Sequence, residues 1–305
     1  MVIVINQTKI IMIKKRLLSV IAFTIVIASV TAQSPVNGFM QGKGKGNVVV
    51  SYGIEKYDKV FLVPAEVDGV PVFNEVELSS ASLFATYGIT DQLDVVVSLP
   101  YISAKGNASE AVLTNLNFQN TRNGIQDVSV FLKLSPDAFK CNIGSSQLNF
   151  IGAVGVKTPV GDYRADEGLQ SIIAIGNRGT TISTVAIAMF KTKMGIFTTG
   201  QFGGVMGAKT VPDAYISEIK LGYAASKIYV DAFLANQTST SGVDILGNGF
   251  TGFFPVTKVN YTKAGLNIYV PIIESVGVAA GASSVIDGRN IGKATGFYGG
   301  LVYKF

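Results

Sequence analysis

The last twelve residues of the chain read ATGFYGGLVYKF, from Ala294 to Phe305. Alternate positions from Phe297 onward carry apolar or small side chains, and the series ends on an aromatic residue at the free carboxylate. A period of two is typical of a β-strand with one face in an apolar medium. An ordinary core strand that happens to end the chain would show the same alternation. Because chain ends of soluble domains usually fray, the pattern favours a strand that completes a closed sheet.

The composition agrees with a membrane-embedded β-protein. Of the 305 residues, 48% are apolar and only 15% are charged, whereas a typical soluble domain has about 25% charged residues. The chain also has 34 Gly, a residue that weakens helices and allows bends and close backbone approach. Since no linker divides the sequence, we expect one large all-β domain.

The N-terminus has the pattern of a secretory signal peptide. Lys14, Lys15 and Arg16 precede an apolar run that ends in small residues before Gln33. The run covers residues 17–30, which is shorter than the roughly 20 residues of a spanning helix. We therefore predict a signal peptide over residues 1–32, with Met12 favoured over Met1 as the initiator, a flexible leader over residues 33–46, and a barrel over residues 47–305.

Charge and cysteine usage exclude several classes of protein. Removing residues 1–32 takes away four of the 25 basic residues and none of the 20 acidic residues, which leaves 21 basic against 20 acidic. The mature chain is therefore nearly neutral, and nucleic-acid binding is not indicated. Cys141 is the single cysteine, so no internal disulfide is possible.

Alternating segments of about 9 to 13 residues fill the chain after Asn47, close to the length of a tilted strand that crosses a bilayer. They are joined alternately by short turns and by long polar connections. This alternation and an even strand count predict a transmembrane antiparallel β-barrel of about 12 strands. The predicted strands are residues 48–57, 76–88, 91–101, 125–135, 146–157, 181–191, 194–206, 214–224, 227–237, 258–270, 274–286 and 294–305.

Charged residues within a strand fall on the same parity, for example Asp127 with Lys133, or Glu218 with Lys220. A basic residue near the middle of the lipid face costs about 2–4 kcal/mol, so we expect this parity to face the lumen. Glu77 is an exception at the start of a strand. The lumen-facing candidates are Asp127, Phe131, Lys133, Lys157, Glu218, Lys220, Tyr229, Asp231, Phe233, Tyr261, Lys263 and Tyr269.

Three motifs resemble the outer-membrane barrel family named for the meta-pathway of phenol degradation, whose members are often described as transporters. The first is YGITDQLD over residues 87–94, followed by SLPY at 98–101; the second is GIQD at 124–127 with Lys133; the third is GVKTPVGD at 155–162. Gly88 and Asp91 fit a tight turn, and Pro100 is expected to end its strand. The sequence departs from the family in lacking Trp and in having IGNRG at residues 175–179.

The absence of histidine removes many enzymatic hypotheses. Neither a Ser-His or Cys-His nucleophile nor a His-based metal site can be built, so we predict neither an enzyme nor a cofactor. Asp162, Asp166 and Glu167 lie in one connection. They are the residue types that hold a divalent ion, but a solvated loop is the favoured interpretation, and we predict no metal site.

The leading hypothesis is a bacterial outer-membrane channel for passive transport of small, hydrophobic or aromatic solutes; the solute class is implied by the family resemblance. The alternative is a non-conducting structural or surface-interaction barrel that acts through its long outer loops. The C-terminal run resembles the closing strand of outer-membrane barrels. That resemblance implies an assembly signal at Leu301, Tyr303 and Phe305, with the barrel-assembly machinery, outer-membrane lipid and lipopolysaccharide as partners. The Phe305 ring is expected at the periplasmic edge of the bilayer, and the residue is expected to make no ladder hydrogen bond in the membrane core.

Overall fold

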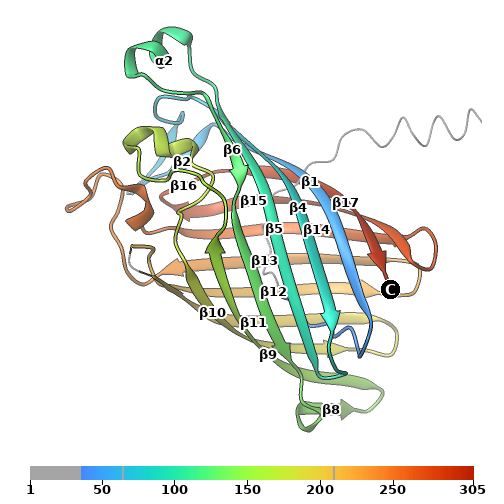
Figure 1. The fold of residues 1–305 in the computed structure, drawn as a ribbon. Coiled ribbons are helices and arrows are strands. Elements are labelled where there is room, and N and C mark those ends of the chain that lie inside the picture. Colours follow the sequence, from blue (N-terminus) through green and yellow to red (C-terminus); the bar gives the residue numbers. More distant parts are fainter. Residues whose placement is uncertain (1–35, 64, 209) are drawn as a thin grey trace, which may run out of the picture.

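The chain folds into a closed antiparallel barrel of twelve strands in the computed structural model, which describes residues 36–63, 65–208 and 210–305 (Figure 1). The predicted signal peptide lies outside the described residues. The barrel strands are β1 (Gly46–Tyr57), β4 (Val76–Gly88), β5 (Leu93–Gly106), β6 (Thr121–Ile125) continued by β7 (Asp127–Leu134), β9 (Ser146–Pro159), β10 (Thr181–Lys191), β11 (Ile196–Gly207), β12 (Ala214–Ala224), β13 (Tyr229–Ser239), β14 (Asn260–Pro271), β15 (Val276–Arg289) and β17 (Thr295–Lys304).

The first and last strands close the ring. β1 pairs with β17 from Asn47 opposite Lys304 to Lys56 opposite Thr295. Phe305 extends this seam, because its backbone N–H donates to the Gly46 carbonyl at 3.1 Å and its carbonyl accepts from the Gly46 N–H at 3.0 Å. These two hydrogen bonds extend the ladder by one residue at the end of the two strands. Closure leaves no strand edge along the wall, as a bilayer requires.

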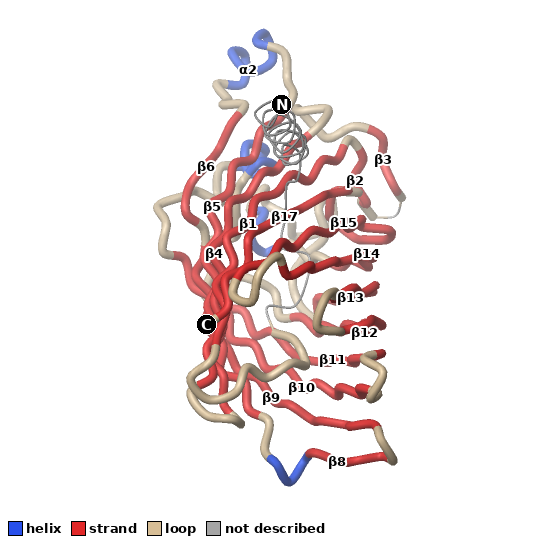
Figure 2. The backbone as a smooth tube through the Cα atoms, turned by 90° about the vertical axis from the view of Figure 1, so that its right-hand side faces the viewer, coloured by secondary structure: helices blue, strands red, loops and turns tan. Residues whose placement is uncertain are grey.

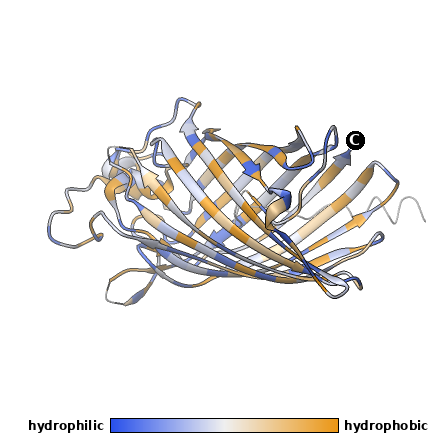
Figure 3. Ribbon diagram, turned by 90° about the horizontal axis from the view of Figure 1, so that it is seen from below, coloured by the Kyte–Doolittle hydropathy of each residue, from blue (hydrophilic) through white to orange (hydrophobic). Residues whose placement is uncertain are grey.

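Side chains alternate between the barrel interior and its outer surface. On β10, Thr181, Ser183 and Val185 are buried, whereas Ile182 between them is exposed. Leu83, Leu132, Phe202 and Leu301 are exposed in the same way on other strands. The same alternation appears as bands of contrasting hydropathy along the strands in Figure 3. An apolar exterior around a polar interior is the pattern of transmembrane barrels.

The two ends of the barrel differ. At one end, here called the short-turn end, the strands are joined by tight turns such as residues 89–92 and 192–195. The opposite, long-loop end carries connections over residues 58–75, 107–120, 160–180 and 240–259. A small sheet of β16 (Ile291–Gly292), β2 (Lys59–Phe61) and β3 (Glu66–Asp68) lies at this end. Helix α2 (Glu110–Leu116) projects from it, opposite to β8 (Lys140–Ile143) at the short-turn end (Figure 2).

Three local features differ from the sequence prediction. Pro100 does not end its strand: β5 continues to Gly106, and the neighbouring strand instead breaks at Gln126, between β6 and β7, because Pro100 has no N–H to donate. The connection after β7 contains a 3₁₀ turn, η1 (Asp137–Phe139), and the β8–β9 hairpin.

Short helical segments also occur in the connections between strands. Helix α2 begins at Ser109, whose side chain accepts from the Val112 N–H, and ends at Asn117 in the left-handed conformation. Further 3₁₀ turns are η2 (Gly168–Ile173) and η3 (Phe254–Val256). In the part of the chain that the structure describes, no helix combines the length and hydropathy needed to cross a bilayer.

Candidate channel lumen

Ionisable side chains inside the barrel are arranged as pairs on its wall. Lys133 Nζ lies 3.3 Å from Asp94 Oδ2, Lys220 Nζ lies 3.2 Å from Glu218 Oε1, and Lys263 Nζ lies 3.4 Å from Glu55 Oε2. Each pair is almost fully buried. A charge withdrawn from water is tolerated when an opposite charge and hydrogen bonds compensate for the lost hydration. The pairing therefore makes the interior polar without giving it a large net charge.

Asp231 and Asp127 are held differently. Asp231 accepts hydrogen bonds from the Tyr229 hydroxyl at 2.6 Å and from the Asn267 amide at 2.7 Å. Asp127 lies 3.6 Å from Lys157 Nζ and accepts a hydrogen bond from the Tyr163 hydroxyl. Burial raises the pKa of Tyr163, and this hydrogen bond to Asp127 raises it further. The tyrosine therefore stays protonated and acts as a donor.

Aromatic rings occupy the remaining space along the wall, often above a glycine of the next strand. A Cβ added to Gly155 would lie 2.3 Å from the Phe131 ring, and one added to Gly265 would lie 2.5 Å from the Phe233 ring. These glycines are therefore required for close approach of a ring to the neighbouring backbone. The Phe197 and Tyr229 rings stack with centroids 5.4 Å apart.

All twelve candidate lumen residues lie in barrel strands, on the parity of the buried polar side chains. Most are buried; Tyr229, Tyr261 and Tyr269 are partly buried, and Lys157 is half exposed. They come from β7 (Asp127, Phe131, Lys133), β9 (Lys157), β12 (Glu218, Lys220), β13 (Tyr229, Asp231, Phe233) and β14 (Tyr261, Lys263, Tyr269).

The candidate set omits several residues that the structure places in the interior. Asp94 alternates with the apolar residues of β5, so the alternation in the sequence would have found it. Glu55 is followed by Lys56 on the opposite parity, so the positions of the charges on β1 do not single it out. Gln201 carries no charge, and it was missed for that reason. Its amide donates to Glu218 at 2.7 Å.

Residues 36–41 lie against the inner wall of the barrel near the short-turn end, although the leader of which they form a part is predicted to be flexible. Val36 is 1% exposed and packs with Val96, Ile187 and their neighbours. Phe39 meets Phe197 and Tyr229 edge to face, at centroid distances of 5.1 and 6.0 Å. These rings bury apolar area that a free segment would leave in water.

Hydrogen bonds from the wall fix the backbone of this segment. Lys133 Nζ donates to the Phe39 carbonyl at 2.5 Å, and the Gln41 N–H donates to the Asp94 carboxylate at 3.1 Å. The Lys43 N–H donates to Asp91 at 2.9 Å. The wall residues that hold the leader thus include both aspartates of the 87–94 motif.

A second set of segments covers the inner wall at the long-loop end. Phe73, Ile173 and Ile175 pack with Val76 of β4 and Ala104 of β5 in one buried apolar cluster. The cluster therefore joins the 58–75 and 160–180 connections to the inner face of the barrel. The cluster was not expected, because both connections are predicted to be polar loops.

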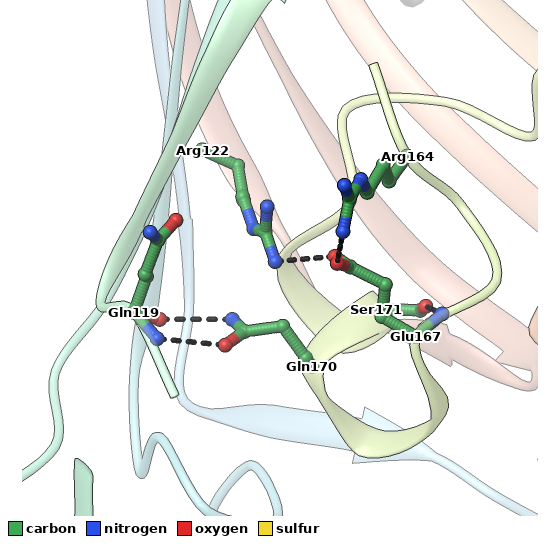
Figure 4. Close-up of polar contacts among 6 residues, drawn as sticks. All are labelled: Gln119, Arg122, Arg164, Glu167, Gln170 and Ser171. Atoms are coloured by element: carbon green, nitrogen blue, oxygen red, sulfur yellow. Dashed lines mark hydrogen bonds and ion pairs between the residues drawn. The ribbon is translucent and has the colours of Figure 1, made fainter. Parts of the chain in front are cut away.

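Connection 160–180 is also fastened to the strand beside it (Figure 4). The Gln170 side chain accepts from the Gln119 N–H at 2.7 Å and donates to the Gln119 carbonyl at 2.8 Å. Glu167 pairs with Arg122 and, at 3.1 Å, with Arg164. Asp162 of the same connection pairs with Arg178 at 3.1 Å. Among the described residues, no acidic cluster suited to a metal ion is found.

No family model matches the chain, and no curated protein matches its sequence. Solved structures do match. An outer-membrane channel from Pseudomonas putida F1 is 13% identical, with a TM-score of 0.68, over 90% of this chain and all of that one. The translocator domain of the autotransporter NalP from Neisseria meningitidis is 13% identical, with a TM-score of 0.48, over 87% of this chain and 89% of that one. The likeness to the first structure shows that this chain has the fold of an outer-membrane β-barrel.

Proposed function

We propose that the protein is an outer-membrane channel for passive transport of small solutes, with hydrophobic or aromatic solutes as the favoured class. The apolar exterior of the barrel and its polar, ring-lined interior support this proposal. The shared fold with an outer-membrane channel adds to it, although fold alone does not determine function.

One observation carries the proposal: the interior is occupied by a separate segment of the chain and not by wall side chains alone. Residues 36–41 are attached through a few hydrogen bonds and ring contacts, none of which belongs to the barrel ladder. A barrel of twelve strands is wider than the eight-stranded barrels that side chains can fill. The segment can therefore leave without breaking a strand pair, and its departure would open the short-turn end.

The wall favours uncharged solutes. Most of its buried acidic and basic groups are paired, as in Asp94 with Lys133 and Glu218 with Lys220, and Asp231 is held by neutral donors. The net charge of the wall is therefore small, and little field remains to attract an ion. Aromatic rings such as Phe197 and Tyr229 offer apolar contact between these pairs. We also propose membership of the phenol-degradation barrel family, because the three motifs at residues 87–101, 124–133 and 155–162 resemble that family. Asp91 and Asp94 of the first motif hold the leader.

A reversible lock on the leader tests the proposal. A Cβ at Gly38 would lie 2.9 Å from the Met189 Cβ, so Gly38→Cys with Met189→Cys can form a disulfide after a shift of about 1 Å. Cys141→Ser removes the native thiol. In planar bilayers, we expect small conductance steps when the disulfide is oxidised and larger ones after reduction, whereas Gly38→Cys alone should not respond to reductant. The absence of conductance steps in both the oxidised and the reduced protein would refute the channel function.

The alternative is a non-conducting barrel that acts through its long-loop end. Helix α2 favours it, because this helix has no buried residue and exposes Val112 and Leu116. Deleting residues 108–118 should leave conductance unchanged if the protein is a channel. A silent barrel whose binding to cells or to other proteins is lost with this deletion would instead support the alternative.

A further inference from the structure

A pocket of about 400 Å³ lies at the long-loop end of β13, β14 and β15, beside the turn between β2 and β3. Its polar lining comes mainly from alternate residues on the outer surface of the wall, namely Asn236 and Thr238 on β13 and Asn260 and Thr262 on β14. Further along the same strands, the outward positions are Leu234 and Leu266. The pocket therefore begins where the apolar band of the barrel ends.

A β-bulge completes the pocket. The register between β14 and β15 shifts at Thr262, so Lys263 pairs with Val285 while Thr262 pairs with Asp287. Ile286 is the extra residue. Without it, Asp287 would share the inward parity of Val285. Bulges commonly redirect side chains at barrel rims, and this one turns the Asp287 carboxylate outward, next to the amide and hydroxyl groups.

The hydrogen-bonding groups of the pocket suit a ligand rich in hydroxyl groups. Thr238 donates to Asn236, which donates to Thr262, both at 3.2 Å. The Asn260 carbonyl accepts from the Ser239 N–H, which leaves the Asn260 NH₂ group as a donor toward the pocket. Among the described residues, no hydrogen bond or ion pair to the Asp287 carboxylate is found. A carboxylate accepts hydrogen bonds only, whereas amides and hydroxyls both donate and accept.

The charges exclude an anionic ligand. Arg289 is the basic residue in the lining, and both of its bonds, at 2.6 Å, go to Asp244 of connection 240–259. The remaining charge in the lining, Asp287, is negative. A phosphate would therefore meet a carboxylate and no available cation, whereas a neutral ring with several hydroxyls finds donors and acceptors. Val63 and Leu62 add apolar surface at the edge for the C–H face of such a ring.

We infer that this pocket binds a neutral sugar, and its position on the outside of the wall assigns it to the headgroup of a membrane glycolipid. The inference rests on the membrane insertion in the proposed function, but not on conduction. The glycolipid site and the channel function can therefore be refuted independently. A free saccharide from solution would use the same groups.

A tryptophan reporter gives a direct test, because the chain has no Trp of its own. Val63→Trp places one at the pocket edge. The mature protein is kept in a polyoxyethylene detergent and titrated with dodecyl maltoside, with maltose, and with dodecylphosphocholine as a chain without a sugar. We expect a saturable emission change with dodecyl maltoside and none with dodecylphosphocholine. A response to dodecyl maltoside at far lower concentration than to maltose supports the glycolipid; equal responses assign the site to free saccharide.

Matched variants separate recognition from general membrane effects. Asn236→Leu with Thr238→Val removes three polar groups and should weaken binding roughly tenfold or more. Thr184→Val, an outward threonine on β10 far from the pocket, should leave it unchanged. If the double variant does not fold, Asp287→Asn serves the same test at an exposed position. Native mass spectra of the chain without the reporter should rank the ligands identically. No response to either sugar, an equal response to dodecylphosphocholine, or undiminished binding in the Asn236→Leu, Thr238→Val double variant or in Asp287→Asn would overturn the inference.

Discussion

Lys133 and Asp94 stand directly opposite each other on β7 and β5, with 3.3 Å between Nζ and Oδ2 and with side chains that are 1% and 0% exposed. The same two side chains bind the leader on either side of Met40, through the Phe39 carbonyl and the Gln41 N–H. The pair therefore serves both the wall of the barrel and the segment that occupies it.

Breaking this pair should release the leader. Asp94→Asn leaves the Lys133 ammonium buried without its counter-charge, which costs about 3–5 kcal/mol for a fully buried pair. We expect a lower temperature of gel-mobility transition and larger conductance steps. The double variant Asp94→Asn with Lys133→Met removes the uncompensated charge and should recover part of the thermal stability while conductance stays high. A double variant less stable than either single one would contradict this account.

The two faces of β7 should differ in their tolerance of charge. Leu132 is 46% exposed on the outer surface, whereas Ser129 lies on the interior parity with Lys133. Leu132→Arg places a base against lipid at about 2–4 kcal/mol, so it should lower the folded yield far more than Ser129→Arg. Folded yield in detergent can be read from heat-modifiable gel mobility. Equal yields would mean that the two faces are reversed.

Phe305 contributes backbone hydrogen bonds to the seam and an aromatic ring to its surface. Two variants separate these contributions. Deleting the residue removes both hydrogen bonds to Gly46 and the ring that stacks near Tyr87 and Tyr303. Phe305→Ala keeps the backbone bonds and removes only the ring. If the ring is an assembly signal, Phe305→Ala should reduce insertion in cells while refolding in detergent remains normal, and the deletion should impair both. Normal insertion of Phe305→Ala would exclude the signal.

Glu167 should control the mobility of connection 160–180. It is the acidic partner of both Arg122 and Arg164, so Glu167→Gln removes two ion pairs and leaves the apolar cluster intact. We expect faster amide hydrogen exchange over residues 164–173. Asp162→Asn, which removes only the exposed pair with Arg178, is the matched control. Unchanged exchange in Glu167→Gln would show that the apolar cluster alone holds the connection.

The Asp244–Arg289 contact should make connection 240–259 resistant to acid. Hydrogen bonds from Arg289 lower the pKa of Asp244 from 3.8 to about 2. Because the folded-state pKa is lowered, this contribution to stability is complete above the ordinary pKa and disappears as pH falls toward 2. Protection of the Val243 amide, which donates to the Val256 carbonyl, should therefore persist at pH 4 and fall toward pH 2. In Asp244→Asn that fall should be absent.

The sequence predicts the barrel well because a wall between lipid and an aqueous interior imposes one rule on every strand. The alternation of apolar and polar residues predicts β10 and β12 with their observed bounds. The connections follow as the residues between the predicted strands. The rule fails where the constraint is local. The break opposite Pro100 and the bulge at Ile286 each depend on the register between two neighbouring strands. The alternation within one strand contains no information on the register with its neighbour.

The interior was less predictable for a different reason. Charge parity points to residues such as Glu218 and Lys220, because only the inner face tolerates them. It contains no information on what fills the barrel. The Gly- and Lys-rich run over residues 42–46 suggests a free leader, yet Val36 and Phe39 just before it are the residues that pack against the wall. Two apolar residues in a short polar stretch carry too weak a pattern to predict that contact.

The leader reaches partners that are synthesised long after it. Its contacts extend from Phe39 to Lys133 and from Val36 to Gln201, separations of 94 and 165 residues. Contacts between such distant positions form late, because the chain between them must first be ordered. The contacts of the leader with β11 therefore form only after that strand exists, although the leader precedes every strand in the sequence. We expect each new molecule to pass through an open intermediate, so the rate at which the leader docks sets how long a freshly inserted barrel leaks.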